Sequence, residues 1–157
     1  MRHLRFALIA LLVAAGSVPA QQAAPSTPAA KPDLEYLTPF GTPSRPFSPA
    51  VRVGDLIFLS GQIGTNADAG GTLVEGGIEA ETRQTLLNIR RVLELVGSGM
   101  DRVVKCTVMM ADMAEWDRMN VIYREMFPPG RLPARSALGA NKLALDARVE
   151  IECIATR

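Results

Sequence analysis

Histidine is nearly absent from this chain, which has one, His3, among its 157 residues. His3 lies in an N-terminal segment that we expect to be removed on export, so the folded protein would contain none. That absence excludes Ser–His–Asp triads, Cys–His nucleophiles, histidine zinc sites and imidazole proton shuttles. Any acid–base chemistry must therefore come from carboxylates, Tyr, Lys, Cys or bound water.

Cysteine is scarce as well, with only Cys106 and Cys153 in the chain. Their spacing fits no Cys-rich metal site, and we expect no metal. Both lie in apolar, strand-like runs, where Cys is usually a small buried hydrophobe, so we expect two buried thiols. A disulfide stays open as the alternative, because exported proteins reach compartments where disulfides form.

An excess of charge is also missing: the chain has 17 Lys and Arg against 16 Asp and Glu. Removal of residues 1–20 takes away Arg2 and Arg5 and no acid, which leaves 15 basic against 16 acidic residues. A domain this close to neutral has no basic footprint for nucleic acid. No later stretch is long and apolar enough to cross a membrane. After cleavage we therefore expect the protein to bind neither nucleic acid nor a membrane.

The N-terminus has the pattern of a signal peptide. Arg2 and Arg5 precede an unbroken apolar run over 6–15, and small residues follow at 18–20, where a signal peptidase cuts. The run is shorter than the roughly 20 residues of a membrane helix, although an uncleaved anchor or a buried helix is the alternative. We expect a signal peptide over 1–20 and a periplasmic or secreted protein.

The rest of the chain divides into a tether and one domain. Residues 21–32 are mainly Ala, Pro, Gln, Ser and Thr with one charge, which predicts a flexible tether before a domain over 33–157. Glycines between 61 and 71 predict a loop. Hydrophobic periodicity predicts the elements of the domain. They are a hairpin over 51–60, helices over 78–96 and from 112 to 127, and strands over 103–110, 134–138 and 148–156.

This order predicts an α+β fold in which two helices cover one face of a mixed sheet. In the last strand Val149 and Ile151 would face the helices, and Glu150 and Glu152 the other side. The strand over 103–110 is largely apolar in both registers, so its second face also needs a cover. With no third helix, a second copy of the chain is the natural cover, with Glu150 and Glu152 near the subunit interface.

Two residues stand out as candidates for chemistry. Arg135 follows Pro133 and Ala134, and a guanidinium held by a restrained turn suits bidentate carboxylate binding. The alternative is a structural salt bridge from Arg135 to Glu150 or Glu152. Glu150 lies in an apolar strand, where a partly enclosed carboxylate has a raised pKa and can activate a water.

Six segments of the chain keep a characteristic order and spacing: 59–63 (LSGQI), 84–88, 105–108 (KCTV), 119–123, 133–136 (PARS) and 149–155 (VEIECIA). With these segments the chain resembles the RidA/YjgF family over about residues 45–156. The resemblance implies a chorismate-mutase-like α+β fold and a homotrimer with three pockets between subunits. It also implies hydrolysis of reactive 2-imino (enamine) acids to 2-keto acids and ammonia, with no metal or organic cofactor.

The resemblance also assigns roles to residues. It implies that Arg135 clamps the substrate carboxylate and that Glu150 orients or activates the attacking water. The further substrate-binding positions that it implies are Phe47, Ser60, Gly61, Asn120 and Ala137.

Two of these positions depart from the family. The family often has Tyr where this chain has Phe47, and Cys where this chain has Ala137. A hydroxyl and a polar part of the pocket lining are therefore missing here. The longer segment 138–147 can also reshape the pocket rim. These departures keep an alternative open, a non-catalytic trimeric module that binds carboxylate metabolites or acts on client proteins as a chaperone.

Overall fold

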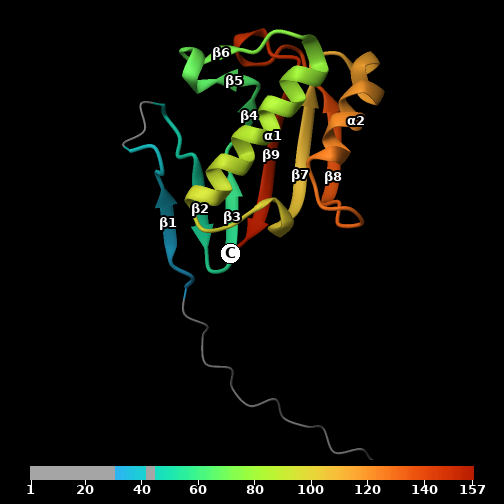
Figure 1. Cartoon of the computed structure of the whole chain (residues 1–157). Coiled ribbons are helices and arrows are strands. Elements are labelled where there is room, and N and C mark those ends of the chain that lie inside the picture. The colour runs from blue at the N-terminus through green and yellow to red at the C-terminus, as the bar shows by residue number, and fades with distance from the viewer. Residues whose placement is uncertain (1–30, 42–44) are drawn as a thin grey trace, which may run out of the picture. The chain divides into compact units, whose positions relative to one another are not determined.

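The computed structural model describes residues 31–41 and 45–157 (Figure 1). The expected signal peptide over 1–20 and most of the expected tether lie outside the described residues. Residues 32–157 form one compact unit. No helix in the described part of the chain is long and apolar enough to cross a membrane.

One mixed sheet forms the centre of the domain, with the strand order β1-β2-β3-β9-β7-β8 and β4 also paired with β9. All neighbours are antiparallel except β7 and β8, which are parallel. The crossover between those two carries α2, as a parallel connection requires. The strands are β1 (Leu34–Leu37), β2 (Ala50–Val53), β3 (Leu56–Leu59), β4 (Gln62–Ile63), β7 (Val103–Met110), β8 (Ala134–Gly139) and β9 (Val149–Thr156).

Two helices and several short elements complete the fold. The helices are α1 (Gly77–Leu95) and α2 (Trp116–Glu125). A second, two-stranded sheet joins β5 (Thr65–Asn66) to β6 (Thr72–Leu73). Single 3-10 turns are η1 (Ala67–Ala69), η2 (Met100–Arg102), η3 (Met113–Glu115) and η4 (Ala144–Asp146).

The predicted hairpin, both helices and the three later strands are confirmed within a few residues. The sequence did not predict β1, and the glycine-rich stretch predicted as a loop contains β4, β5, η1 and β6. Three of these missed elements are strands of two residues, too short to show the alternation that identifies a strand. The second helix begins at Trp116 rather than at residue 112, because η3 takes up residues 113–115. Asp112 caps η3 by accepting a hydrogen bond from the Ala114 N–H at 2.8 Å.

The end of α1 follows the predicted glycine signal. Gly97 has a φ of 82°, the left-handed conformation that favours glycine. The Ser98 N–H donates to the Leu93 carbonyl at 2.8 Å, and the Gly97 N–H donates to the Glu94 carbonyl at 3.3 Å. These two bonds form a Schellman motif, which satisfies carbonyls that the helix end would otherwise leave open.

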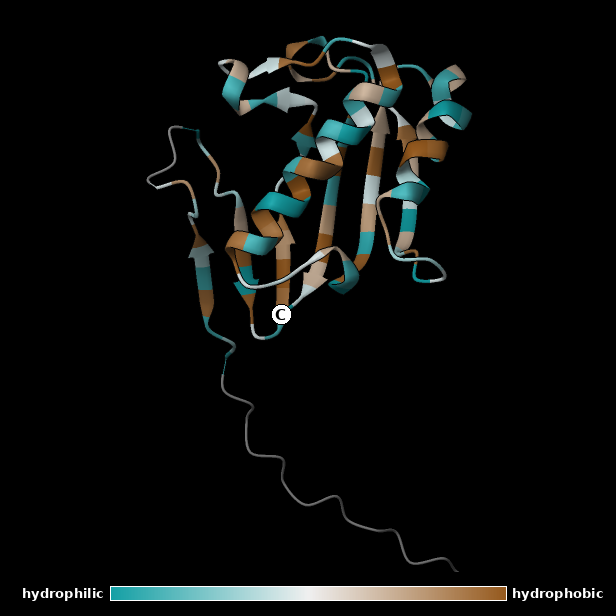
Figure 2. Cartoon of the chain, in the orientation of Figure 1, coloured by the Kyte–Doolittle hydropathy of each residue, from teal (hydrophilic) through white to brown (hydrophobic). Residues whose placement is uncertain are grey.

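Both helices pack on the same face of the sheet (Figure 1). Val149 and Ile151 are fully buried on that face, while Glu150 and Glu152 lie on the other, as predicted. The second face remains partly apolar, since Phe58 and Leu138 are 41% and 47% exposed. Figure 2 shows apolar positions along the central strands as well as along the helix faces. The α+β architecture predicted from the sequence is therefore confirmed.

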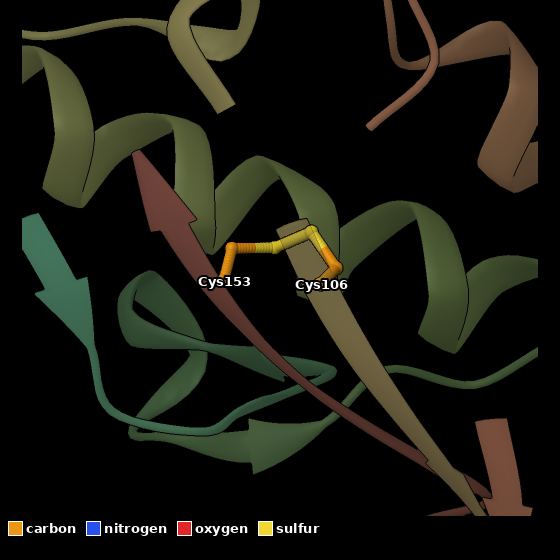
Figure 3. The surroundings of a disulfide bond; sticks show 2 residues. All are labelled: Cys106 and Cys153. Carbon is orange, nitrogen blue, oxygen red and sulfur yellow. A yellow bond between two sulfur atoms is a disulfide. The ribbon is translucent and has the colours of Figure 1, made fainter. Parts of the chain in front are cut away.

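Cys106 and Cys153 form a disulfide, so the prediction of two free thiols is wrong (Figure 3). The two residues are direct partners in the antiparallel pairing of β7 with β9, and their Cα atoms lie 4.1 Å apart. Both are buried to about 1% exposure, so they do pack in the core as predicted. Their pairing depends on the strand register, which neither strand reveals by itself.

Candidate functional site

Arg135 lies on β8 at the edge of the sheet, beside α2 (Figure 1). It is the register partner of buried Cys106, so its side chain lies on the helix side of the sheet. The guanidinium carbon is 4.8 Å from the ring centroid of Trp116 and 4.7 Å from that of Tyr123. Its Nη1 donates a hydrogen bond to the Asn120 Oδ1 at 2.7 Å.

One face of α2 thus holds the guanidinium. Trp116, Asn120 and Tyr123 are spaced by four and three residues, which places them on the same side of a helix. The aromatic contacts leave the in-plane N–H groups available. Within residues 31–41 and 45–157, Arg135 forms no ion pair, so the alternative of a salt bridge to Glu150 or Glu152 is not found.

A cavity of about 350 Å³ opens at this guanidinium. Its volume is within the range of small-molecule sites, roughly 300–1,000 Å³. Arg124 adds a second positive charge to its wall. Because a carboxylate is the natural partner of a planar guanidinium, the cavity suits a small organic acid. Its lining residues are Trp116, Asn120, Tyr123, Arg124, Leu132, Pro133 and Arg135.

Tyr123 lines the same cavity, but its hydroxyl is buried. The residue is 2% exposed, and its Oη has no hydrogen-bond partner among the described residues. Burial raises the pKa of the Tyr123 phenol to about 12, although the charge of Arg135 acts in the opposite direction. The phenol therefore stays protonated at neutral pH, and its Oη is buried without a partner in the described part of the chain rather than exposed to the cavity.

Glu150 forms a second group with Ser60 and Gly61. Its Oε1 occupies the space in which a Cβ at position 61 would lie, so any larger residue there would displace the Glu150 carboxylate. Burial raises the pKa of the Glu150 carboxyl, and the negative charge of Glu152 raises it further. Ser60 faces the preceding segment, where its Oγ donates to the Ser48 carbonyl at 2.7 Å.

The two groups lie on opposite faces of the sheet within one chain. Arg135 of β8 pairs with Cys106 of β7, and Glu150 of β9 pairs with Met109 of β7. The two residues are therefore two strands apart and are offset by three residues along β7. With about 4.8 Å between strands and about 3.3 Å per residue, their Cα atoms are roughly 14 Å apart. A single chain cannot direct both side chains at one ligand, so the pocket predicted from the sequence needs a second copy.

Phe47 and Ala137 occupy different surroundings from each other. Ala137 pairs with Val108 on the helix side of β8, two residues from Arg135, and packs against the core. The Phe47 ring lines a cavity against α1 and lies 6.0 Å from the Arg45 guanidinium. The next residue, Ser48, accepts a hydrogen bond from Ser60, so the backbone at Phe47 lies close to the Glu150 group. The Phe47 ring itself lies in a different cavity.

Trp116 and Tyr123 are functional candidates that the sequence did not identify. Their spacing predicted core packing, and Tyr123 is indeed buried. The same spacing also places them beside Asn120, and only the position of β8 reveals that both rings flank a guanidinium. In the described part of the chain, no cluster of three or more His, Cys, Asp or Glu side chains could hold a metal ion.

Known proteins resemble this chain in sequence and in fold. The mouse protein named 2-iminobutanoate/2-iminopropanoate deaminase is 42% identical over 112 residues, which cover 71% of this chain and 82% of the mouse protein. The Arabidopsis thaliana protein named Reactive Intermediate Deaminase A, chloroplastic, is 40% identical over 111 residues, or 71% of this chain. The match spans only 58% of the length of that plant relative.

Solved structures agree with these relatives. The crystal structure of the YjgF gene product of E. coli has a TM-score of 0.68 and 32% identity, over 73% of this chain and 91% of that one. The crystal structure of yeast Mmf1 has a TM-score of 0.71 and 30% identity, over 80% of this chain and 99% of that one. A family model described as endoribonuclease L-PSP matches residues 41–157. The chain therefore belongs to the endoribonuclease L-PSP family, which includes RidA and YjgF.

Proposed function

We propose that this protein hydrolyses reactive 2-imino acids, and their enamine tautomers, to 2-keto acids and ammonia. The observation that carries the proposal is the guanidinium of Arg135, fixed by three residues of α2 at the mouth of an open cavity. The names of the mouse and Arabidopsis relatives support the same reaction class.

In this proposal Arg135 binds the substrate carboxylate through two parallel N–H···O bonds. Trp116, Tyr123 and Asn120 fix the plane of the guanidinium before the substrate arrives, so binding costs less side-chain entropy. The held carboxylate fixes the adjacent imino carbon, and a positioned electrophile needs little further activation.

Glu150 acts on water in the proposed reaction. Its raised pKa makes it a stronger base than an exposed carboxylate, so it can take a proton from water as the oxygen adds to the imino carbon. Glu150 gives this first proton to the imino nitrogen, which completes a neutral carbinolamine. As the C–N bond breaks, Glu150 takes the hydroxyl proton and passes it to the departing nitrogen, so ammonia leaves and the water oxygen becomes the keto oxygen.

The proposed site lies between subunits of a homotrimer. Arg135 and Glu150 point to opposite faces of one sheet, so a neighbouring copy has to present its Glu150 to the Arg135 cavity. The partly exposed apolar side chains of Phe58 and Leu138 supply a surface for that contact. A closed ring of copies would cover this face in every subunit.

We also propose that the protein is exported and loses residues 1–20. The supporting observation is the sequence pattern of two arginines, an apolar run and small residues at 18–20. Mass spectrometry of the protein recovered from the periplasm or the medium tests this. A product that begins at Gln21 is expected, and an intact N-terminus in the cell pellet contradicts it.

A non-catalytic carboxylate-binding or chaperone-like module is the second candidate. Phe47 and Ala137 favour it, because they remove a hydroxyl and a thiol from positions that the resemblance assigns to the pocket. In that case the Arg135 cavity would bind a 2-keto acid without turnover, or the protein would suppress aggregation of client proteins.

One assay distinguishes the two candidates. The purified protein is mixed with 2-iminopropanoate, generated in place by an amino-acid oxidase, and pyruvate formation is followed against the spontaneous rate. We expect acceleration that is lost in Arg135→Ala and kept in Arg83→Gln, which removes an equal charge from an exposed ion pair with Glu125. Equal rates for the native protein and Arg135→Ala would refute catalysis at this cavity.

A further inference from the structure

A second cavity, of about 390 Å³, lies between α1 and residues 40–41 and 45–49. It is large enough for a small organic molecule. Its residues come from parts of the chain far apart in sequence. They include Phe40, Arg45, Phe47, Gln62, Asn88 and Arg91.

This cavity is separate from both groups of the proposed active site. Gln62 pairs with Ile151, which is fully buried beneath the helices, so Gln62 lies on the helix side of the sheet. Glu150 lies on the other side, and the Arg135 cavity is lined by α2 rather than α1. Of the pocket positions that the family resemblance implies, only Phe47 contacts this cavity. A trimer closed over the opposite sheet face would leave it open.

The cavity has a positive charge that no lining residue balances. Arg45 and Arg91 both line it, and none of the described lining residues is acidic. Neither arginine forms an ion pair within residues 31–41 and 45–157. Two guanidinium groups without carboxylate partners favour an anionic ligand.

The aromatic rings of the cavity indicate which kind of uncharged body the ligand should carry. Arg91 stacks over the Phe40 ring at 5.4 Å, and Arg45 lies 6.0 Å from the centroid of the Phe47 ring. A stacked guanidinium keeps its N–H groups in the plane of the cation, where they can bind a carboxylate. The two phenyl rings also provide apolar walls, which a flat hydrocarbon body fills better than a bare inorganic anion does.

The polar wall beside the rings is rigid. The Asn88 Nδ2 donates to the Ile63 carbonyl at 3.0 Å and to the Thr65 carbonyl at 2.9 Å, and its Oδ1 accepts from Gln84 at 2.9 Å. These bonds fix α1 against β4 and β5, so the cavity has a formed floor before any ligand arrives.

We propose that this cavity is a second binding site that takes a small aromatic carboxylate, with Arg45 and Arg91 on the carboxylate and Phe40 and Phe47 against the ring. Neither arginine belongs to the Arg135 or Glu150 group, whereas Phe47 is also one of the substrate-binding positions that the family resemblance implies.

The probe for this site is 2-naphthoate, titrated into the purified protein and followed by its fluorescence and by calorimetry. We expect one saturable site per chain, and about tenfold weaker binding for Arg91→Gln and for Arg45→Gln, since each loses a charge-assisted hydrogen bond. The uncharged analogue 2-naphthamide should bind at least about tenfold more weakly, and inorganic phosphate should not compete.

Arg135→Gln is the control that separates the two cavities. It should bind 2-naphthoate as the native protein does, while losing imine hydrolysis if the proposed function is right. Loss of naphthoate binding in Arg135→Gln would place the ligand in the other cavity and overturn the proposal. Unchanged binding in both Arg45→Gln and Arg91→Gln, or no saturable binding in the native protein, would overturn it equally. Circular dichroism verifies that each variant is folded.

Discussion

Arg135 donates a hydrogen bond from Nη1 to the Asn120 Oδ1 at 2.7 Å, which joins the edge strand β8 to the middle of α2. The bond uses one nitrogen of the guanidinium and leaves the others for a ligand. It also explains why an amide lies there, because a carboxylate would neutralise the charge on which anion binding depends. Asn120 is therefore a positioning residue for Arg135.

Asn120→Ala should weaken substrate binding more than it slows turnover. Without the Oδ1 acceptor the guanidinium can rotate out of the plane that suits a bidentate carboxylate, so we expect KM to rise about tenfold with a small change in kcat. Steady-state kinetics with enzymatically generated 2-iminopropanoate measure both constants. An unchanged KM in a folded Asn120→Ala variant would show that Asn120 does not position Arg135.

Glu150 should make the stability of the fold depend on pH. Its folded pKa is raised above the unfolded value, so the fold favours the protonated carboxyl. The stability that this group contributes is complete below the unfolded pKa and is lost as the pH rises through the folded pKa. Glu150→Gln removes the titration, so the variant should gain stability relative to the native protein at neutral pH, with the difference fading in acid.

Denaturant unfolding at a neutral and an acidic pH measures this difference, provided that both proteins have the same oligomeric state. Glu152→Gln is the matched control, because it keeps the Glu150 carboxyl and removes the second cause of its raised pKa. At neutral pH it should raise the free energy of unfolding less than Glu150→Gln does. A Glu150→Gln variant whose advantage is the same at both pH values would contradict the raised pKa.

Gly61→Ala should displace the Glu150 carboxylate, because the added methyl group would overlap Oε1. Because the carboxylate is the far end of a flexible side chain that can move aside, we expect a small loss of stability together with a large fall in kcat. The same substitution in a Glu150→Ala background meets no carboxylate, so its stability cost should largely disappear. Chemical unfolding of the four proteins in this cycle supplies the test, and equal costs in both backgrounds would argue against the contact.

The order and type of the main elements could be predicted from the sequence, because each depends on local pattern. The apolar period of α1 and its glycine stop are of this kind, and the Schellman motif at Gly97 follows from them. Elements held by pairing rather than pattern were missed. The two-residue strand β4 exists because Gln62 and Ile63 pair with β9, which no window of sequence around them reveals.

The site was only partly predictable for the same reason. Arg135 and Glu150 were identified as candidates, but their placement on opposite faces follows from two strand registers. The disulfide between Cys106 and Cys153 depends on one of those registers too. The aromatic pair around Arg135 had the spacing of an ordinary core stripe, and residues 116 and 123 acquire their second role only when β8 packs beside α2.

The disulfide should stabilise the isolated domain strongly. It closes a loop with a sequence separation of 47 residues, and cross-links of that size typically contribute about 2–4 kcal/mol. A Cys106→Ala/Cys153→Ala double variant should unfold at a lower denaturant concentration and should be insensitive to reductant. After reduction, the denaturant concentration at which the native protein unfolds should shift toward that of the double variant. Identical unfolding of the native protein with and without reductant, with both thiols free to alkylation, would mean that the bond does not form in solution.

The intersubunit site leads to the sharpest test, which mixes two inactive proteins. Arg135→Ala and Glu150→Ala should each abolish imine hydrolysis. If every site takes Arg135 from one chain and Glu150 from its neighbour, then equal mixing with subunit exchange gives complete sites with a probability of about one in four. The mixture should therefore recover roughly a quarter of the native rate, and sedimentation should show trimers throughout. If both residues instead acted within one chain, no mixture could contain a complete site, and the rate would stay at the spontaneous value.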